Sequence, residues 1–329
     1  MRQYHKSWNL SPRESRSGFS LIELMAVIVV ISILLAMLLP AINSARRTAR
    51  NAQVVSDIKN IEAGIANFKS KYGIEPPSSF ILREDGAYTS DKIDRDSLAL
   101  MRVLWPDYDP TTGTVVQTTP SISRDLNEDG NQNSVFQMNG AECLVFFLGG
   151  PGMLFDKDAT DGIKNVVPMG FSANPTNPFA SGGTRVGPFY EFNLSRLSDV
   201  STPPNGCPEL LDPLPNQTMP YQYFSSYGGR GYALNPNATI ANVFDHIKGT
   251  SDDMVSVYFQ SSRGTSAPFT IGFWNPKSYQ IISPGPDGLY GTGGGYRENK
   301  FFGNDGTAAR QAQAERDNIT NFSGGPLQP

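Results

Sequence analysis

The feature that most constrains this chain is an apolar run near its N-terminus, from Phe19 to Ile42. About 20 consecutive apolar residues are enough for one helix to cross the hydrocarbon core of a bilayer. Glu23 is the one charged residue within this run. A carboxylate inside a membrane segment is costly, so it is rarely found there without a functional role.

Two ordinary kinds of membrane segment account for part of this run. A secretory signal has an apolar core of about 7–15 residues and a small-residue cleavage site after it. Here the apolar core is longer, and the sequence at Ala41-Ile42-Asn43 is a poor cleavage site. A plain single-span anchor fits the length, but it explains neither Gly18 directly before Phe19 nor the position of Glu23.

The sequence G-F-S-L-I-E, from Gly18 to Glu23, resembles the processing site of type IV prepilins and pseudopilins. The resemblance implies that a prepilin peptidase cleaves after Gly18 and methylates the new N-terminal amine of Phe19. It also implies that Glu23 neutralises the N-terminal amine of a neighbouring subunit in a filament. Pro40 falls where many pilins carry a proline, and it is a potential kink in the helix.

Basic residues flank the apolar run on both sides. Residues 1–18 carry Arg2, Lys6, Arg13 and Arg16 against Glu14. A basic flank favours the cytoplasmic side, so the chain after the span is expected outside the cytoplasm. After the span, Arg46, Arg47 and Arg50 either extend to the lipid headgroups or form ion pairs between subunits.

Beyond Pro40 the apolar residues recur at steps of three and four up to Tyr72, which indicates one face of a helix. Gly73 and Pro76-Pro77 then mark the helix end. One helix from Phe19 to Tyr72 would be about 80 Å long at 1.5 Å per residue. The predicted segments are a leader (1–18), a membrane and filament-core helix (19–42), its amphipathic continuation (43–72) and an extracytoplasmic head (73–329).

The head is predicted to be α+β, with the long helix packed on an antiparallel β-sheet and with large irregular insertions. A short helix is expected over Asp96–Leu104, and Ala141–Leu148 fits either a buried strand or a short apolar helix. Aromatic and β-branched residues predict strands. These strands are Tyr221–Ser225, Val255–Phe259, Phe269–Trp274 and Tyr279–Ser283.

The C-terminal region contains a candidate calcium site. The strand Tyr279–Ser283 runs into P-G-P-D-G, and D-N-I-T-N-F follows near the chain end. This pattern resembles the C-terminal loop of type II secretion major pseudopilins, which implies Ca²⁺ held by Asp287 and Asp317. Asp305 is a further candidate without a motif match, and a plain turn at Pro-Asp-Gly is the alternative.

A second candidate calcium loop begins at Asp125. Asp125, Asn127, Asp129 and Gly130 match the first half of an EF-hand loop. The twelfth position, where a bidentate glutamate is expected, is Phe136. A solvated turn is therefore the alternative.

The two cysteines are Cys143 and Cys207. In an oxidising exterior such a pair can form a disulfide. A buried free thiol at Cys143 is the alternative, because the sequence does not place the two residues within bonding distance.

Catalytic arrangements are largely missing from the sequence, and no enzyme is predicted. The two histidines are His5, in the leader, and His246, so a two-histidine zinc site in the mature chain is excluded. Carboxylate pairs such as Asp252-Asp253 are expected by chance in acidic loops. The net charge of −4 gives no support for nucleic acid as the main partner.

These observations predict a structural subunit of a type IV pilus or a type II secretion-like filament. Its expected partners are a prepilin peptidase, other copies of itself, other pilins or pseudopilins, and an assembly platform in the inner membrane. It would be a single-pass inner-membrane protein before assembly. The alternatives are a membrane-anchored binding protein that does not polymerise and an anchored hydrolase.

Overall fold

The computed structural model describes most of the chain after the leader. The described residues are 19–110, 125–127, 129–156, 166–201, 203–232, 257–263, 270–291, 293–297, 300–301 and 315–327. The chain divides into two compact units, Met1–Ala49 and Arg50–Pro329. The second unit, which contains the C-terminal part of the long helix, is called the head below.

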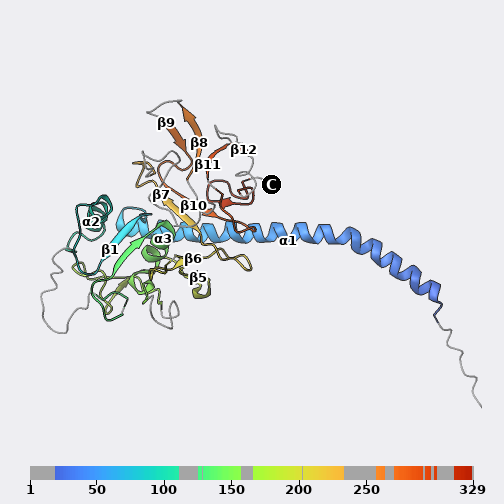
Figure 1. Ribbon diagram of the computed structural model, residues 1–329, viewed down its shortest axis with the longest axis horizontal. Coiled ribbons are helices and arrows are strands. Elements are labelled where there is room, and N and C mark those ends of the chain that lie inside the picture. Colours follow the sequence, from blue (N-terminus) through green and yellow to red (C-terminus); the bar gives the residue numbers. More distant parts are fainter. Residues whose placement is uncertain are drawn as a thin grey trace, which may run out of the picture. The chain divides into compact units, whose positions relative to one another are not determined.

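The long N-terminal helix α1 spans Leu21–Tyr72 and is continuous through Pro40. Figure 1 shows it as one helix. In the first unit its apolar side chains are exposed, for example Ile22, Leu34 and Met37. It is the one helix in the described part of the chain that is long and apolar enough to cross a membrane. The predicted helix and its end at Tyr72 are confirmed.

The C-terminal part of α1 is the centre of the head. Val54, Ile58, Ile61, Ile65 and Phe68 are buried, at the steps of three and four that the sequence predicted. Their partners include the short helix α3 (Gly140–Gly149), in which every residue is buried. The rings of Phe68 and Phe147 meet edge to face, with centroids 5.8 Å apart.

The segment predicted as either a strand or a helix is therefore helix α3. Asn139 caps it: Asn139 Oδ1 accepts from Glu142 N, and the Glu142 carboxylate accepts from Asn139 N. This capping box satisfies backbone donors that a strand would have paired with a neighbour. Gly140 opens the helix because a Cβ there would lie 1.8 Å from the Tyr223 carbonyl oxygen.

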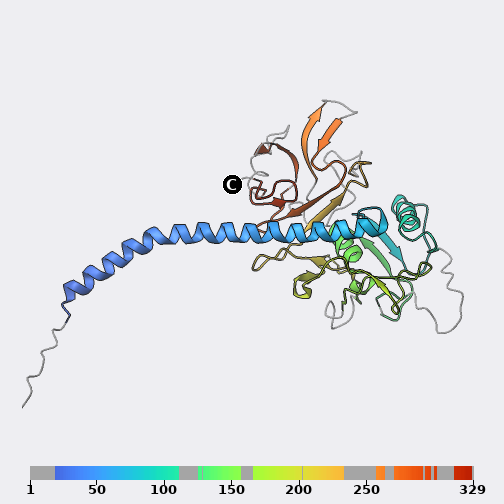
Figure 2. The ribbon, with the colours of Figure 1, turned by 180° about the vertical axis from the view of Figure 1, so that it is seen from behind.

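Short strands form several small sheets within the head (Figures 1 and 2). An antiparallel three-stranded sheet has the order β13-β10-β7, where β13 is Ile319–Thr320, β10 is Tyr279–Ser283 and β7 is Gln222–Ser225. A second sheet has the order β12-β11-β8-β9, with β12 at Lys300–Phe301, β11 at Gly294–Arg297, β8 at Tyr258–Arg263 and β9 at Thr270–Phe273.

The remaining elements cover the rest of the head. The helix α2 (Lys92–Leu104) includes the predicted segment and begins four residues earlier, after Asp91. Three antiparallel pairs join β1 (Phe80–Arg83) to β2 (Val135–Met138), β3 (Phe171–Ser172) to β4 (Arg185–Val186), and β5 (Leu197–Ser198) to β6 (Glu209–Leu210). Two short 3₁₀ turns lie at Pro151–Met153 and Leu194–Arg196.

The α+β class is confirmed, and each predicted strand overlaps an observed one, although β8 shares only Tyr258 and Phe259 with its prediction and continues to Arg263. The arrangement of the strands differs in two ways. The strands form several sheets instead of one, because proline- and glycine-rich segments interrupt the pairing. In addition, β11 pairs with β8 in parallel. The ends of two predicted strands, at residues 255–256 and 269, lie outside the described residues.

A polar cluster fixes α1 within the head. Asp57, on α1, accepts hydrogen bonds from Arg196 Nη2 at 2.6 Å, from Tyr221 Oη at 2.9 Å and from Tyr190 Oη at 3.2 Å. Arg196 also donates to the Leu211 carbonyl oxygen. The Arg196 and Asp57 side chains are 18% and 12% exposed, so solvent screens their attraction only weakly.

Replacing Asp57 should therefore destabilise the head strongly. In Asp57→Ala the Arg196 guanidinium loses its counter-charge in a largely buried site, which should cost about 3 kcal/mol of unfolding free energy. Urea unfolding of the full-length chain in detergent, followed by the fluorescence of Trp105 and Trp274, measures this change. Asp96→Ala, which breaks the exposed Lys92–Asp96 pair, is the control and should cost less than about 1 kcal/mol. Equal losses in both variants would contradict the role of Asp57.

Candidate functional site

The N-terminal processing segment lies at the start of α1. Gly18 falls outside the described residues, and Phe19 precedes α1 and is 80% exposed. Glu23 lies in the first turn of α1, where its Oε2 accepts a hydrogen bond from Ser20 N at 2.9 Å. A carboxylate in this position is favoured by the helix dipole and satisfies a backbone donor at the helix start.

Glu23 therefore has a role within its own chain that the sequence analysis missed. Ser20 and Glu23 form the S-x-x-E pattern of a capping box, which was readable from the sequence. The bond from Ser20 N leaves the Glu23 carboxylate able to accept further hydrogen bonds, because each of its two oxygens can accept more than one. Pro40 lies within α1 and does not end it.

The structure brings together the two aspartates of the C-terminal loop. Asp287 N donates to Asp317 Oδ2 at 3.0 Å across 30 residues of sequence. Asp287 Oδ1 accepts from Leu289 N at 2.8 Å. Burial raises the pKa of Asp287, and the hydrogen bonds from Leu289 N and with Asp317 oppose that rise. Asp305 lies outside the described residues.

Gly285 makes the approach of these two segments possible. Its φ is +66°, and a Cβ there would lie 2.2 Å from the Asp317 carbonyl oxygen. The Gly285 carbonyl accepts from Gln217 Nε2 at 2.9 Å. Two carboxylates and nearby carbonyl oxygens are suitable Ca²⁺ donors, yet no group of three or more His, Cys, Asp or Glu in the described residues is arranged to hold a metal.

The loop at Asp125 is closed by hydrogen bonds of its own. Asp125 Oδ1 accepts from Asp129 N at 2.9 Å, and Oδ2 accepts from Gly130 N at 2.7 Å. Asn127 Nδ2 donates to Asp129 Oδ2 at 2.9 Å. These bonds are those of a side-chain-stabilised turn, so they do not need a metal.

Sequence reasoning missed Glu84, which lies beside this loop. Glu84 follows β1 and is buried, and its two oxygens accept from Leu126 N at 2.6 Å and Ser134 N at 3.0 Å. It thus joins both ends of the loop to the β1–β2 pair. Burial is the main cause that raises the pKa of Glu84. Its place beside the loop depends on pairing across 42 and 50 residues, which no local pattern reveals.

The cysteines are both buried free thiols in the structure. Cys143 lies in α3, and Cys207 lies just before β6. Burial raises the pKa of the Cys207 thiol well above its usual value, and nearby carboxylates, first Glu142, add to the rise. A free buried thiol is the alternative stated for Cys143 from the sequence.

A third feature that the sequence analysis missed is a pair of buried carboxylates, Glu142 and Glu209. Glu142 Oε1 accepts from Ser201 Oγ and Asn205 Nδ2, both at 2.9 Å. Glu209 is fully buried and accepts from Val200 N at 3.0 Å. Burial raises the pKa of Glu142 to about 7, and burial together with the charge of Glu142 raises that of Glu209 further above its usual range.

The histidines and the acidic pair that the sequence analysis weighed, without predicting a catalytic site, cannot be placed in the structure. His5, His246 and the pair Asp252-Asp253 all lie outside the described residues. The Glu142–Glu209 pair is enclosed by the head core, so it lacks the access to solvent that a substrate would need. The arrangement therefore supports a structural role for these carboxylates.

The buried pair should make the head less stable as pH rises. Burial raises the pKa of Glu142 in the folded state from 4.5 to about 7. Protonated Glu142 therefore contributes its full share to the unfolding free energy below about pH 4.5. As pH rises through 7, the unfolding free energy falls by an amount on the order of 3 kcal/mol. Urea unfolding of the full-length chain between pH 4.5 and 8 should show the loss in wild type. Glu142→Gln should flatten the curve, and the exposed-site control Glu191→Gln should not. A curve in Glu142→Gln as steep as that of wild type would contradict the assignment.

The comparisons with known proteins concern the N-terminal segment. Residues 13–39 match the family model of the prokaryotic N-terminal methylation motif. No curated protein and no solved structure matches the chain. The matched residues contain the Gly18-Phe19 pair and Glu23 and continue into the apolar part of α1. The motif and the long apolar helix together support a type IV prepilin-like protein.

Proposed function

We propose that this chain is a structural subunit of a type IV pilus or a type II secretion-like filament. The observation that carries the proposal is the match to the methylation motif at residues 13–39, which overlaps the start of the long helix α1 (Leu21–Tyr72). Among the residues that the structure describes, the first part of α1 has exposed apolar side chains, and the second part has one face buried in the head. A filament supplies the missing partners by packing the apolar parts of many subunits together.

The proposed sequence of events begins in the inner membrane, with the head outside the cytoplasm. A prepilin peptidase cleaves after Gly18 and methylates Phe19, and the subunit then enters a filament with the help of an assembly platform. In lipid, the drive for the helices to associate comes from packing and polar pairing, since lipid tails are as apolar as the helices. A polar pair that involves Glu23 would therefore contribute specificity to assembly.

The role of Glu23 in assembly can be separated from its role as a helix cap. In Glu23→Gln the amide oxygen can still accept the hydrogen bond from Ser20 N, whereas the negative charge is lost. We expect the variant to be processed normally, with Phe19 as the methylated N-terminus, and to be absent from filaments. Intact-mass analysis measures processing, and the amount of protein in sheared surface fractions measures assembly.

Two further variants complete this experiment. Glu62→Gln, a change on the head part of α1, is the control for loss of one carboxylate from the same helix and should assemble. Gly18→Leu should remain uncleaved. A wild-type N-terminus at Met1 would contradict the prepilin assignment. Filament yields of Glu23→Gln equal to wild type would contradict the role of the Glu23 charge in assembly.

We also propose that the C-terminal loop binds Ca²⁺ between Asp287 and Asp317. Support comes from the contact between these residues and from Gly285, which brings the Asp317 backbone close to the loop. Bound calcium would offset the repulsion between the two carboxylates and fix the chain end against β10. The Asp125 loop is the second candidate.

Calcium should then stabilise the head. At a free concentration of about 100 times the dissociation constant, binding to the native state adds about 2.7 kcal/mol to the unfolding free energy. Melting the full-length chain in detergent with calcium and then with chelator measures the shift, which Asp287→Ala should abolish. The double variant Asp125→Ala/Asp129→Ala should retain it. No shift in wild type would reject the site, and loss of the shift in the double variant alone would assign calcium to the Asp125 loop.

A further inference from the structure

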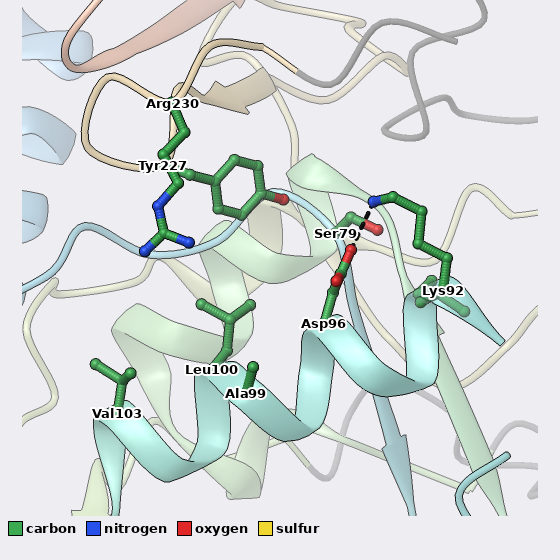
Figure 3. A pocket seen from close by; sticks show the side chains of 9 residues that line it. Ser79, Lys92, Asp96, Ala99, Leu100, Val103, Tyr227 and Arg230 are labelled. Carbon is green, nitrogen blue, oxygen red and sulfur yellow. Dashed lines mark hydrogen bonds and ion pairs between the residues drawn. The ribbon is translucent and has the colours of Figure 1, made fainter. Parts of the chain in front are cut away.

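A cavity of about 270 Å³ lies in the head, between α2 and the loop that follows β7 (Figure 3). Helix α2 contributes Ile93, Leu100 and Val103, which are spaced along one face of the helix. The loop contributes Tyr227 and Arg230. Figure 3 shows the Tyr227 ring and the Arg230 guanidinium on the side opposite the side chains of α2. The cavity therefore has an apolar floor, an aromatic wall and a cation.

The loop that carries Tyr227 and Arg230 is held in a defined conformation. Tyr227 has a φ of +52°, a left-handed conformation that is unfavourable for a residue with a side chain. The surrounding bonds maintain it. Ser226 N donates to the Ser278 carbonyl at 2.8 Å, and the Ser226 carbonyl accepts from Gly229 N at 3.1 Å and Gly231 N at 3.2 Å. The ring position is thus set before any ligand arrives, which lowers the entropy cost of binding.

The charges of the cavity are unbalanced. Lys92 Nζ lies 2.6 Å from Asp96 Oδ2, so these two charges compensate each other. Arg230 is exposed, and it has no ion pair or hydrogen bond with any residue that the structure describes. A guanidinium beside an apolar surface favours a planar anion, and a carboxylate matches its donor geometry best.

The length of the cavity along α2 favours a short extended peptide segment over a compact ligand. From Ile93 to Val103 the helix rises about 15 Å at 1.5 Å per residue. About five residues of extended chain span this length. The Val103 side chain is 52% exposed, so the cavity opens along the helix.

Because this cavity opens along α2, it is called the groove below. We propose that the groove binds a short extended peptide segment of a partner protein, with an apolar side chain between Leu100 and the Tyr227 ring and a carboxylate beside Arg230. The inference does not depend on polymerisation, because every residue that it uses belongs to the head. The partner is defined by its chemistry: an apolar anchor within a few residues of an aspartate or glutamate.

Fluorescent pentapeptides titrated into the full-length chain in detergent test this inference. The set contains Leu, Ile, Phe or Tyr at the centre and Asp at each other position in turn, in a serine background. Matched peptides carry Asn in place of Asp. We expect anisotropy to detect binding of a subset of the Asp peptides, with at least tenfold weaker binding of their Asn counterparts.

Arg230→Gln should lower the affinity for the Asp peptides about tenfold and leave that for the Asn peptides unchanged. Arg102→Gln removes an exposed cation of α2 that does not line the groove, and it should bind as wild type does. Leu100→Ser should weaken Asp and Asn peptides alike. The melting temperature of each variant reports whether the head remains folded.

Three results would overturn the inference. One is the absence of binding by every peptide at millimolar concentration. Another is an equal effect of Arg230→Gln and Arg102→Gln in folded protein. The third is tighter binding of octanoate or benzoate than of any peptide, which would assign the groove to a small carboxylate.

Discussion

The contact between Asp57 and Arg196 is the interaction on which the arrangement of the head depends. It joins the central helix to the segment that leads into β5, and Tyr190 and Tyr221 bring two more segments to the same carboxylate. The apolar face of α1 alone would allow the helix to slide or rotate, because hydrophobic contacts have little directionality. A carboxylate with fixed donors on several segments restricts the helix to one register.

A second polar contact repeats this arrangement nearer the C-terminal end of α1. Asn321 exchanges hydrogen bonds with the backbone of Ile281 and donates to Glu62 Oε1 at 3.2 Å. The last strand of the chain, β13, is thereby attached both to β10 and to the helix. Any ligand that orders the Asp287–Asp317 loop acts within four residues of this contact, so loop order and helix attachment are physically linked.

The sequence predicted the individual helices and strands of this protein better than it predicted how they pack together. The period of apolar residues located α1 and its buried face, and aromatic content located β7, β8, β9 and β10. These signals are local. The parallel pairing of β8 with β11, the position of Glu84 beside the Asp125 loop, and the meeting of Glu142 with Glu209 depend on contacts between distant segments. In the candidate sites, the resemblance paired Asp287 with Asp317, whereas the Glu23 cap at Ser20 and the capping box at Asn139 were overlooked although their spacing was visible.

The hydrogen bond between Ser20 N and Glu23 has a consequence for any cation that approaches the helix start. A free glutamate side chain samples many rotamers, and fixing it costs roughly 1.5–2 kcal/mol of entropy. Here the cap already restricts the side chain, with Oε2 occupied by the backbone and Oε1 remaining as an acceptor. Ordering of this carboxylate therefore takes place when the helix forms, and a positively charged group arriving later meets a preorganised anion.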